Sequence, residues 1–129
     1  MSETNKEIVN RVNTAFSENK PEVFLDLCHD DIEWTIVGDQ SFSGKTAIRD
    51  FMSSMEGQEP PKFTVDEIIG EGDSVVCYGT MTMKMENDKE PAPYSYVDAY
   101  RFRDGKIARL QSFIVKHKTE EEKSGTAAA

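Results

Sequence analysis

The sequence has few of the residues that mark several common classes of protein. It contains only two cysteines, Cys28 and Cys77, among 129 residues, and this is too few for the disulfide framework of a small secreted protein. We therefore expect two buried, reduced thiols in a cytoplasmic protein. No apolar run is long enough for a transmembrane helix, and the polar residues 1–7 do not have the pattern of a signal peptide.

Basic residues are scarce relative to acidic ones. The chain has 15 lysine and arginine residues against 24 aspartate and glutamate residues, and its formal net charge is −9. Because phosphate groups are bound by basic surfaces, this balance argues against nucleic acid or an anionic membrane as the main partner. No cluster of potential ligands has metal-binding spacing, and no glycine-rich phosphate loop is present. We expect no metal and no cofactor.

The N-terminal part of the chain has the periodicity of helices. Thr4 and Glu7 have the spacing of a capping box, and apolar residues then recur at helical spacing as far as Phe16. A second, short helix is expected to begin at Pro21, because proline suits the first turn of a helix. A third helix is expected to begin after Ser43, which would act as its N-cap.

Strands dominate the rest of the chain. Five segments have the composition of β-strands: 32–37, 63–70, 74–85, 94–103 and 106–116. The last two are joined by Asp104-Gly105, a hairpin turn signal. This order predicts an α+β fold in which a curved, mainly antiparallel sheet wraps on three helices and encloses a cone-like cavity. We expect one domain over residues 1–117 and a polar, disordered tail over residues 118–129.

Asp98 is the most informative residue of the chain. In a strand it would share one face with four aromatic residues: Tyr94, Tyr96, Tyr100 and Phe102. Such a face is normally buried, and a carboxylate there loses water at a cost unless it is hydrogen-bonded or protonated. Asp98 is therefore a candidate contact for a polar atom of a ligand. The alternative is a structural aspartate that binds a tyrosine hydroxyl, such as that of Tyr78, or an arginine.

Three sequence strings, together with the order of elements, resemble the nuclear transport factor 2-like superfamily. They are residues 29–34 (HDDIEW), 42–51 (FSGKTAIRDF) and 100–107 (YRFRDGKI). Within that superfamily the chain is most similar to the SnoaL-like and ketosteroid-isomerase-like branch, over about residues 6–116. The resemblance implies a cystatin-like α+β barrel that holds a small apolar ligand, although this fold hosts enzymes, binding modules and assembly domains.

The resemblance also implies roles for individual residues. In ketosteroid isomerases an aspartate is the general base, and a tyrosine and a protonated aspartate donate hydrogen bonds to the oxyanion. Those positions fall on Thr35, Val12 and Asp98, respectively. Thr35 is no base near neutral pH and Val12 has no hydrogen to donate, so steroid isomerisation itself is not expected unless Glu33 replaces the base. The resemblance is compatible with isomerase-, hydratase- or cyclase-type chemistry on a carbonyl compound, with Asp98 as acid or oxyanion donor.

The expected cavity wall combines aromatic, aliphatic and hydroxyl side chains. We expect ligand contacts from Thr35, Phe51, Met52, Tyr78, Tyr96, Tyr100, Leu110 and Ile114. A non-catalytic binding module and an assembly domain are the alternatives. His29, which follows a helix end, is a weaker candidate for a general base.

The face of the sheet turned away from the helices is expected to be an interface. The alternation that puts Thr35 and Leu110 in the cavity gives the opposite face these residues: Trp34, Ile36, Ile107, Arg109, Gln111 and Phe113. Such a surface is too apolar to remain open to water. Since related members of the family pair through this surface, we expect a homodimer.

Overall fold

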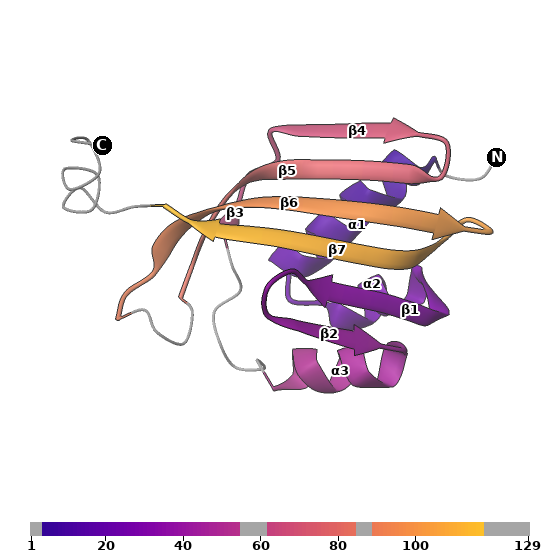
Figure 1. Ribbon diagram of the computed structural model, residues 1–129, viewed down its shortest axis with the longest axis horizontal. Coiled ribbons are helices and arrows are strands. Elements are labelled where there is room, and N and C mark those ends of the chain that lie inside the picture. Colours follow the sequence, from indigo (N-terminus) through magenta and orange to yellow (C-terminus); the bar gives the residue numbers. More distant parts are fainter. Residues whose placement is uncertain (1–3, 55–61, 85–88, 118–129) are drawn as a thin grey trace.

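A computed structural model describes residues 4–54, 62–84 and 89–117 of the chain. Its elements are α1 (Asn5–Ser17), α2 (Pro21–Asp26), β1 (Cys28–Ile36), β2 (Gln40–Ser43), α3 (Lys45–Ser53), β3 (Lys62–Phe63), β4 (Glu67–Glu71), β5 (Ser74–Met83), β6 (Ala92–Arg103) and β7 (Lys106–Lys116) (Figure 1). The predicted α+β class, with three helices and a curled sheet, is confirmed. The predicted tail over residues 118–129 and the predicted strand end at Met85 lie outside the described residues.

The helices begin largely where the sequence predicts. The Thr4 hydroxyl accepts a hydrogen bond from the Glu7 backbone N–H, and the Glu7 side chain accepts one from the Thr4 backbone N–H, which completes the capping box of α1. Pro21 is the first residue of α2. The N-cap of α3 is Gly44 rather than Ser43, which ends β2. Gly44 has a φ of 86°, a conformation that glycine adopts without steric cost.

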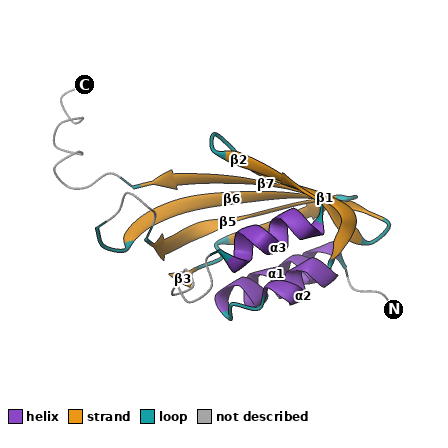
Figure 2. Cartoon of the chain, turned by 90° about the horizontal axis from the view of Figure 1, so that it is seen from below, coloured by secondary structure: helices purple, strands orange, loops and turns teal. Residues whose placement is uncertain are grey.

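The strands form a single sheet of seven strands. Six of them follow the order β2-β1-β7-β6-β5-β3, and β4 pairs with β5. β1 and β7 are parallel, whereas the other pairs are antiparallel. The three helices gather against one face of this sheet, here called the inner face (Figure 2). The opposite, outer face is not covered by a described helix.

The predicted strand 63–70 is interrupted near its middle. β3 and β4 both pair with β5, and the backbone N–H groups of Thr64 and Asp66 continue the ladder by donating to Thr80 and Tyr78. Gly79 lies between these two acceptors on β5. A Cβ atom at Gly79 would lie 2.1 Å from the Thr64 carbonyl oxygen. The segment that joins β3 to β4 can therefore approach β5 this closely only because Gly79 has no side chain.

An extra residue in β7 changes which of its side chains face the helices. Arg101 pairs with Arg109, but the next residue of β6, Phe102, pairs with Ile107. Ala108 is therefore the additional residue of a β-bulge. As a result Ile107 is fully buried, and its predicted position on the outer face is wrong. Beyond the bulge the prediction holds, because Leu110 is buried while Phe113 is exposed.

β1 has a larger irregularity in its pairing with β7, and its residues lie on the faces opposite to those that the family resemblance implied. Cys28 pairs with Ile107, yet the next pair along the two strands is Glu33 with Arg109. After this shift Trp34 contacts the helices, and Ile36 shares its face by alternation. Thr35 consequently lies on the outer face. The predictions that Trp34 and Ile36 face outward and that Thr35 faces inward are therefore wrong.

The core lies between the inner face and the helices. Its buried members include Val9, Val12, Phe24, Leu25, Ile32, Ile48, Val75, Cys77, Tyr100, Ile107 and Leu110. Both cysteines are unpaired and buried, as predicted. Within the described ranges, no helix combines the length and the apolar character needed to cross a membrane.

Candidate functional site

Asp98 lies in the middle of β6 and points to the inner face. It is directly opposite Cys77 on β5 and Ser112 on β7. Its neighbours on the same face, Tyr96 and Tyr100, are 5% and 2% exposed, whereas Asp98 itself keeps intermediate exposure. The residue therefore retains some contact with solvent, although protein atoms surround its carboxyl group.

This environment changes the acidity of Asp98. Burial raises the pKa of the carboxyl group from 3.8 to about 6, and a hydrogen bond with Ser112 opposes part of this effect. No basic side chain in the described ranges stabilises the charged form of Asp98. Near neutral pH such a carboxyl group populates both protonation states, so it can donate a hydrogen bond when neutral and accept one when ionised.

Ser112 links Asp98 to Trp34. The Trp34 Nε1–H donates to Ser112 Oγ over 3.0 Å, and Ser112 is almost fully buried. Neither residue was predicted to belong to the site. The sequence did give a signal for the face of Ser112, because it lies between Leu110 and Ile114, which were both expected in the cavity wall, and alternation gives all three the same face. Its pairing with Asp98 depends on the bulge at Ala108.

A second polar contact comes from helix α1. Asn13 is 7% exposed, and its Nδ2 donates to Cys77 Sγ over 3.4 Å. Burial raises the pKa of the Cys77 thiol, so this group remains neutral near pH 7. Sequence reasoning missed Asn13, although its position four residues after Val9, in the apolar stripe of the helix, could have indicated a buried amide.

The two tyrosines beside Asp98 differ in their hydrogen bonds. Tyr96 Oη donates to the carbonyl oxygen of Thr64 over 2.7 Å. Tyr100 Oη is buried and has no hydrogen-bond partner among the described residues. Burial raises the pKa of both hydroxyl groups well above the ordinary value of 10, so both are neutral in the range in which Asp98 titrates.

Aromatic rings support the Trp34 side of the site. Trp34 lies 5.7 Å from Phe51 and 6.1 Å from Phe42, measured between ring centroids, and Phe42 stacks on Phe51 at 4.4 Å. Phe16 and Phe24 contact the same indole ring. Phe51 of helix α3 therefore helps to fix the ring of Trp34, whose N–H group donates to Ser112.

The other predicted ligand contacts divide between the two faces of the sheet. Leu110, Ile114 and Met52 belong to the core or pack against it on the inner face. Tyr78 lies on the outer face, where its hydroxyl donates to Glu67 over 2.6 Å. Thr35 also lies there and accepts a hydrogen bond from Ser41. The predicted positions of Tyr78 and Thr35 beside Asp98 are therefore wrong.

The positions that correspond to the remaining isomerase groups do not complete a catalytic set. Val12 is fully buried in the core. Glu33 is exposed and shares the outer face with Thr35, so the sheet separates it from Asp98. In the described part of the chain, no group of three or more His, Cys, Asp or Glu residues could hold a metal ion.

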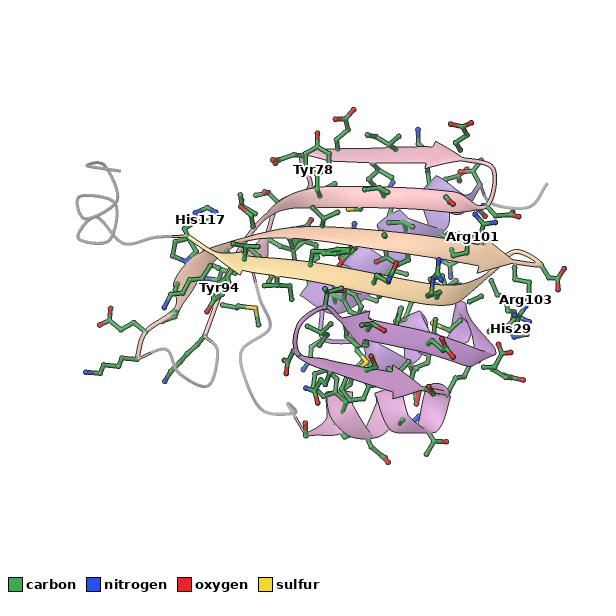
Figure 3. The ribbon with its side chains drawn as sticks, viewed as in Figure 1. His29, Tyr78, Tyr94, Arg101, Arg103 and His117 are labelled. Atoms are coloured by element: carbon green, nitrogen blue, oxygen red, sulfur yellow. The ribbon has the colours of Figure 1, made fainter. Side chains whose placement is uncertain are left out.

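Polar side chains at the two ends of the sheet form contacts of their own. Figure 3 shows His29 and Arg103 near the turn between β6 and β7, and His117 and Tyr94 at the opposite end. Arg103 donates to Asp31 over 2.6 Å, and His29 Nδ1 lies 3.0 Å from both partners. His29 therefore belongs to a surface cluster rather than to the inner face.

An open hollow of about 300 Å³ lies on the surface of α1 and α2, away from Asp98. It is lined by Asn10, Arg11, Thr14, Ala15, Glu18, Lys20 and Val23. No strand of the inner face contributes to it, so it is separate from the candidate site.

The fold and the site together define a class of small α+β proteins in which a curled sheet and three helices surround a polar group on an aromatic wall. A family model described as the SnoaL-like domain matches residues 9–110. The chain belongs to this family, in the nuclear transport factor 2-like superfamily, as its motifs predicted. No curated protein matches the sequence.

Solved structures with the same fold come from several bacteria. A protein of unknown function from Cytophaga hutchinsonii ATCC 33406, described as NTF2-like, shares 26% identity over 87% of this chain and 100% of its own, with a TM-score of 0.70. An LEH-like epoxide hydrolase of M. tuberculosis shares 16% identity over 88% of this chain and 85% of its own, with a TM-score of 0.74. A hypothetical protein from Catenulispora acidiphila DSM 44928 with a ketosteroid isomerase-like fold, solved with trimethylamine, shares 18% identity over 84% of this chain and 85% of its own, with a TM-score of 0.73.

Proposed function

We propose that this SnoaL-like protein binds a small, mainly apolar molecule in a cavity on the inner face, and that Asp98 donates a hydrogen bond or a proton to a carbonyl oxygen of that molecule. The observation that carries the proposal is the Asp98 carboxyl group itself. It lies on an aromatic face and has no described cationic partner, and burial raises its pKa to about 6. A neutral carboxyl group in an apolar site is an effective donor to a developing oxyanion.

The same geometry limits the chemistry. Isomerisation by the ketosteroid mechanism needs a general base in addition to the acid. Thr35 and Glu33 lie on the outer face, and Val12 offers no hydrogen-bond donor. The reactions that fit are those in which one acid polarises a carbonyl group, as in hydratase- or cyclase-type chemistry. Binding without chemistry is the alternative, and recovery of an unchanged ligand would favour it.

The outer face supports a second proposal, which concerns assembly. Val97 and Phe113 are cross-strand partners, and they are 38% and 42% exposed. Val115, two residues further along β7, is 66% exposed. Contiguous apolar side chains on an uncovered sheet are typical of an interface. We propose that two copies of the chain pair through this surface.

The binding proposal can be tested with the single tryptophan of the chain, Trp34. Small ketones are titrated into the protein while the fluorescence of Trp34 is followed, and native mass spectrometry identifies any co-purified ligand. Asp98→Asn should weaken the binding of a ketone at pH 5, where the wild-type carboxyl group is mainly neutral. Asp104→Asn is the matched control, because Asp104 is exposed in the turn at the end of β6 and has a φ of 54°, which asparagine tolerates. Equal binding by all three proteins would contradict the role of Asp98.

A further inference from the structure

The hydrogen-bond roles of Trp34 and Ser112 can be assigned from their chemistry. An indole N–H group can only donate, so Ser112 Oγ is the acceptor of the 3.0 Å contact with Trp34. A serine hydroxyl carries one hydrogen, and this hydrogen remains available for a second partner. Asp98 is directly opposite Ser112 in the ladder and forms a hydrogen bond with its side chain. An ionised carboxyl group can only accept, so the serine donates to it, and in the same orientation the serine donates to the carbonyl oxygen of the neutral acid.

We propose that Trp34 and Ser112 are positioning residues that fix which oxygen of Asp98 carries the proton. Ser112 donates to one carboxyl oxygen, and when Asp98 is neutral its proton is on the other oxygen, where it is available to a carbonyl group of the ligand. This inference rests on the proposed function, and it adds to it the direction in which the acid donates.

The indole N–H group strengthens this relay. A hydroxyl group whose oxygen accepts a hydrogen bond is polarised and becomes a better donor, so the Trp34 N–H favours the orientation in which Ser112 donates to Asp98. In the opposite orientation the serine would accept the proton of neutral Asp98, and that proton would not be available to a ligand. The rings of Phe42 and Phe51 contact the indole of Trp34 and hold its N–H group toward Ser112.

Other titratable groups near Asp98 remain neutral over the relevant range. They are Cys77 on β5, and Tyr96 and Tyr100 on β6, and burial raises the pKa of each. Helix α1 contributes Asn13, an uncharged amide that contacts Cys77. A titration observed in this region around pH 6 can therefore be assigned to Asp98.

The test is the pKa of Asp98, measured by ¹³C NMR of the aspartate carboxyl groups. Asp98→Asn identifies the resonance. Ser112→Ala removes a donor to the ionised form, so the pKa should rise by about 1 unit, as expected for loss of a hydrogen bond to a charged group. Replacement of Trp34 by β-(3-benzothienyl)alanine keeps the bicyclic shape but has no N–H group. The pKa should also rise, because Ser112 is then a weaker donor to the ionised acid.

The combination of the two changes gives the sharpest result. Once the indole N–H is absent, Ser112→Ala should raise the pKa by less than it does in the wild-type protein, because the serine is then a weaker donor to the ionised form. An unchanged pKa after the benzothienyl replacement would overturn the proposed role of Trp34. A pKa that falls in Ser112→Ala alone would overturn the direction assigned to the serine.

Acetophenone, a small apolar ketone, separates this inference from the proposed function. Its affinity for the wild-type protein should increase as the pH falls through about 6, and this dependence should be absent in Asp98→Asn. The benzothienyl protein should bind it more weakly at pH 5, because the proton of Asp98 turns toward Ser112. If acetophenone does not bind at all, the proposed function is contradicted, while the relay is still decided by the pKa values of the variants.

Discussion

Asp98 should make the stability of the protein depend on pH in a sense opposite to that of most carboxyl groups. Burial raises its pKa from 3.8 in the unfolded chain to about 6 in the native state. The native state therefore binds the proton more tightly between these values. The stabilisation from this group is complete below pH 3.8 and is lost as the pH rises toward 6. A shift of this size corresponds to roughly 3 kcal/mol of unfolding free energy.

The measurement compares wild-type protein with Asp98→Asn by urea denaturation between pH 4 and pH 8. Asparagine has nearly the same shape but does not titrate, so the difference between the two proteins isolates Asp98. The unfolding free energy of Asp98→Asn minus that of the wild type should increase by roughly 2 to 3 kcal/mol between pH 4 and pH 7, and then level off. Surface pairs such as Arg103 with Asp31 are present in both proteins, and their contributions cancel.

Two results would refute this reasoning. If the two stability curves run parallel from pH 4 to pH 7, the pKa of Asp98 is not raised in the native state. If the difference decreases with pH, the carboxyl group is stabilised in its charged form, by hydrogen-bond donors or a cation that outweigh its burial. Asp104→Asn, the same substitution at an exposed position in the β6–β7 turn, is measured alongside as the control.

Three further predictions follow from buried or exposed groups. Tyr100→Phe removes a buried hydroxyl without a described partner, so chemical denaturation should show no loss of stability or a gain of about 1 kcal/mol; a clear loss would reveal a partner for the hydroxyl. Gly79→Ala places a Cβ atom 2.1 Å from the Thr64 carbonyl oxygen and should cost at least about 1 to 3 kcal/mol in thermal unfolding, whereas an unchanged midpoint would show that the edge strand can shift. Phe113→Glu puts a charge on the outer face and should convert a dimer to a monomer in light scattering, with an unchanged circular dichroism spectrum; a wild-type monomer at micromolar concentration, or a dimer that survives the substitution, would contradict the proposed interface.

The alternation of a regular strand made part of the site predictable from the sequence. β6 pairs with β5 without a break, so the face shared by Asp98, Tyr96 and Tyr100 could be identified from the sequence. The start of helix α1 could also be predicted from the sequence, because its capping box is formed by Thr4 and Glu7, which are close in the chain. The broad α+β architecture followed from the order of such elements.

The errors have two different sources. Ile107 was misplaced because the bulge at Ala108 adds one residue to β7; a change of one residue moves the side chains beyond it to the other face, and no local pattern reports it.

The error on Trp34 came from the family resemblance, which put Thr35 in the cavity. The local pattern favoured the observed arrangement, because Ile32, Trp34 and Ile36 alternate with polar residues as in a half-buried strand. The relay through Ser112 was missed because Trp34 had been placed on the outer face.

The position of β7 in the sheet also has a consequence for protein synthesis. β7 lies between β1 and β6, so it supplies all the ladder hydrogen bonds that join the first two strands to the later ones. A nascent chain that ends before residue 106 would leave these two parts of the sheet unconnected, each with an exposed strand edge. Such edges are prone to pair with other molecules. Synthesis of β7 is therefore the step at which the growing polypeptide can first bury both edges.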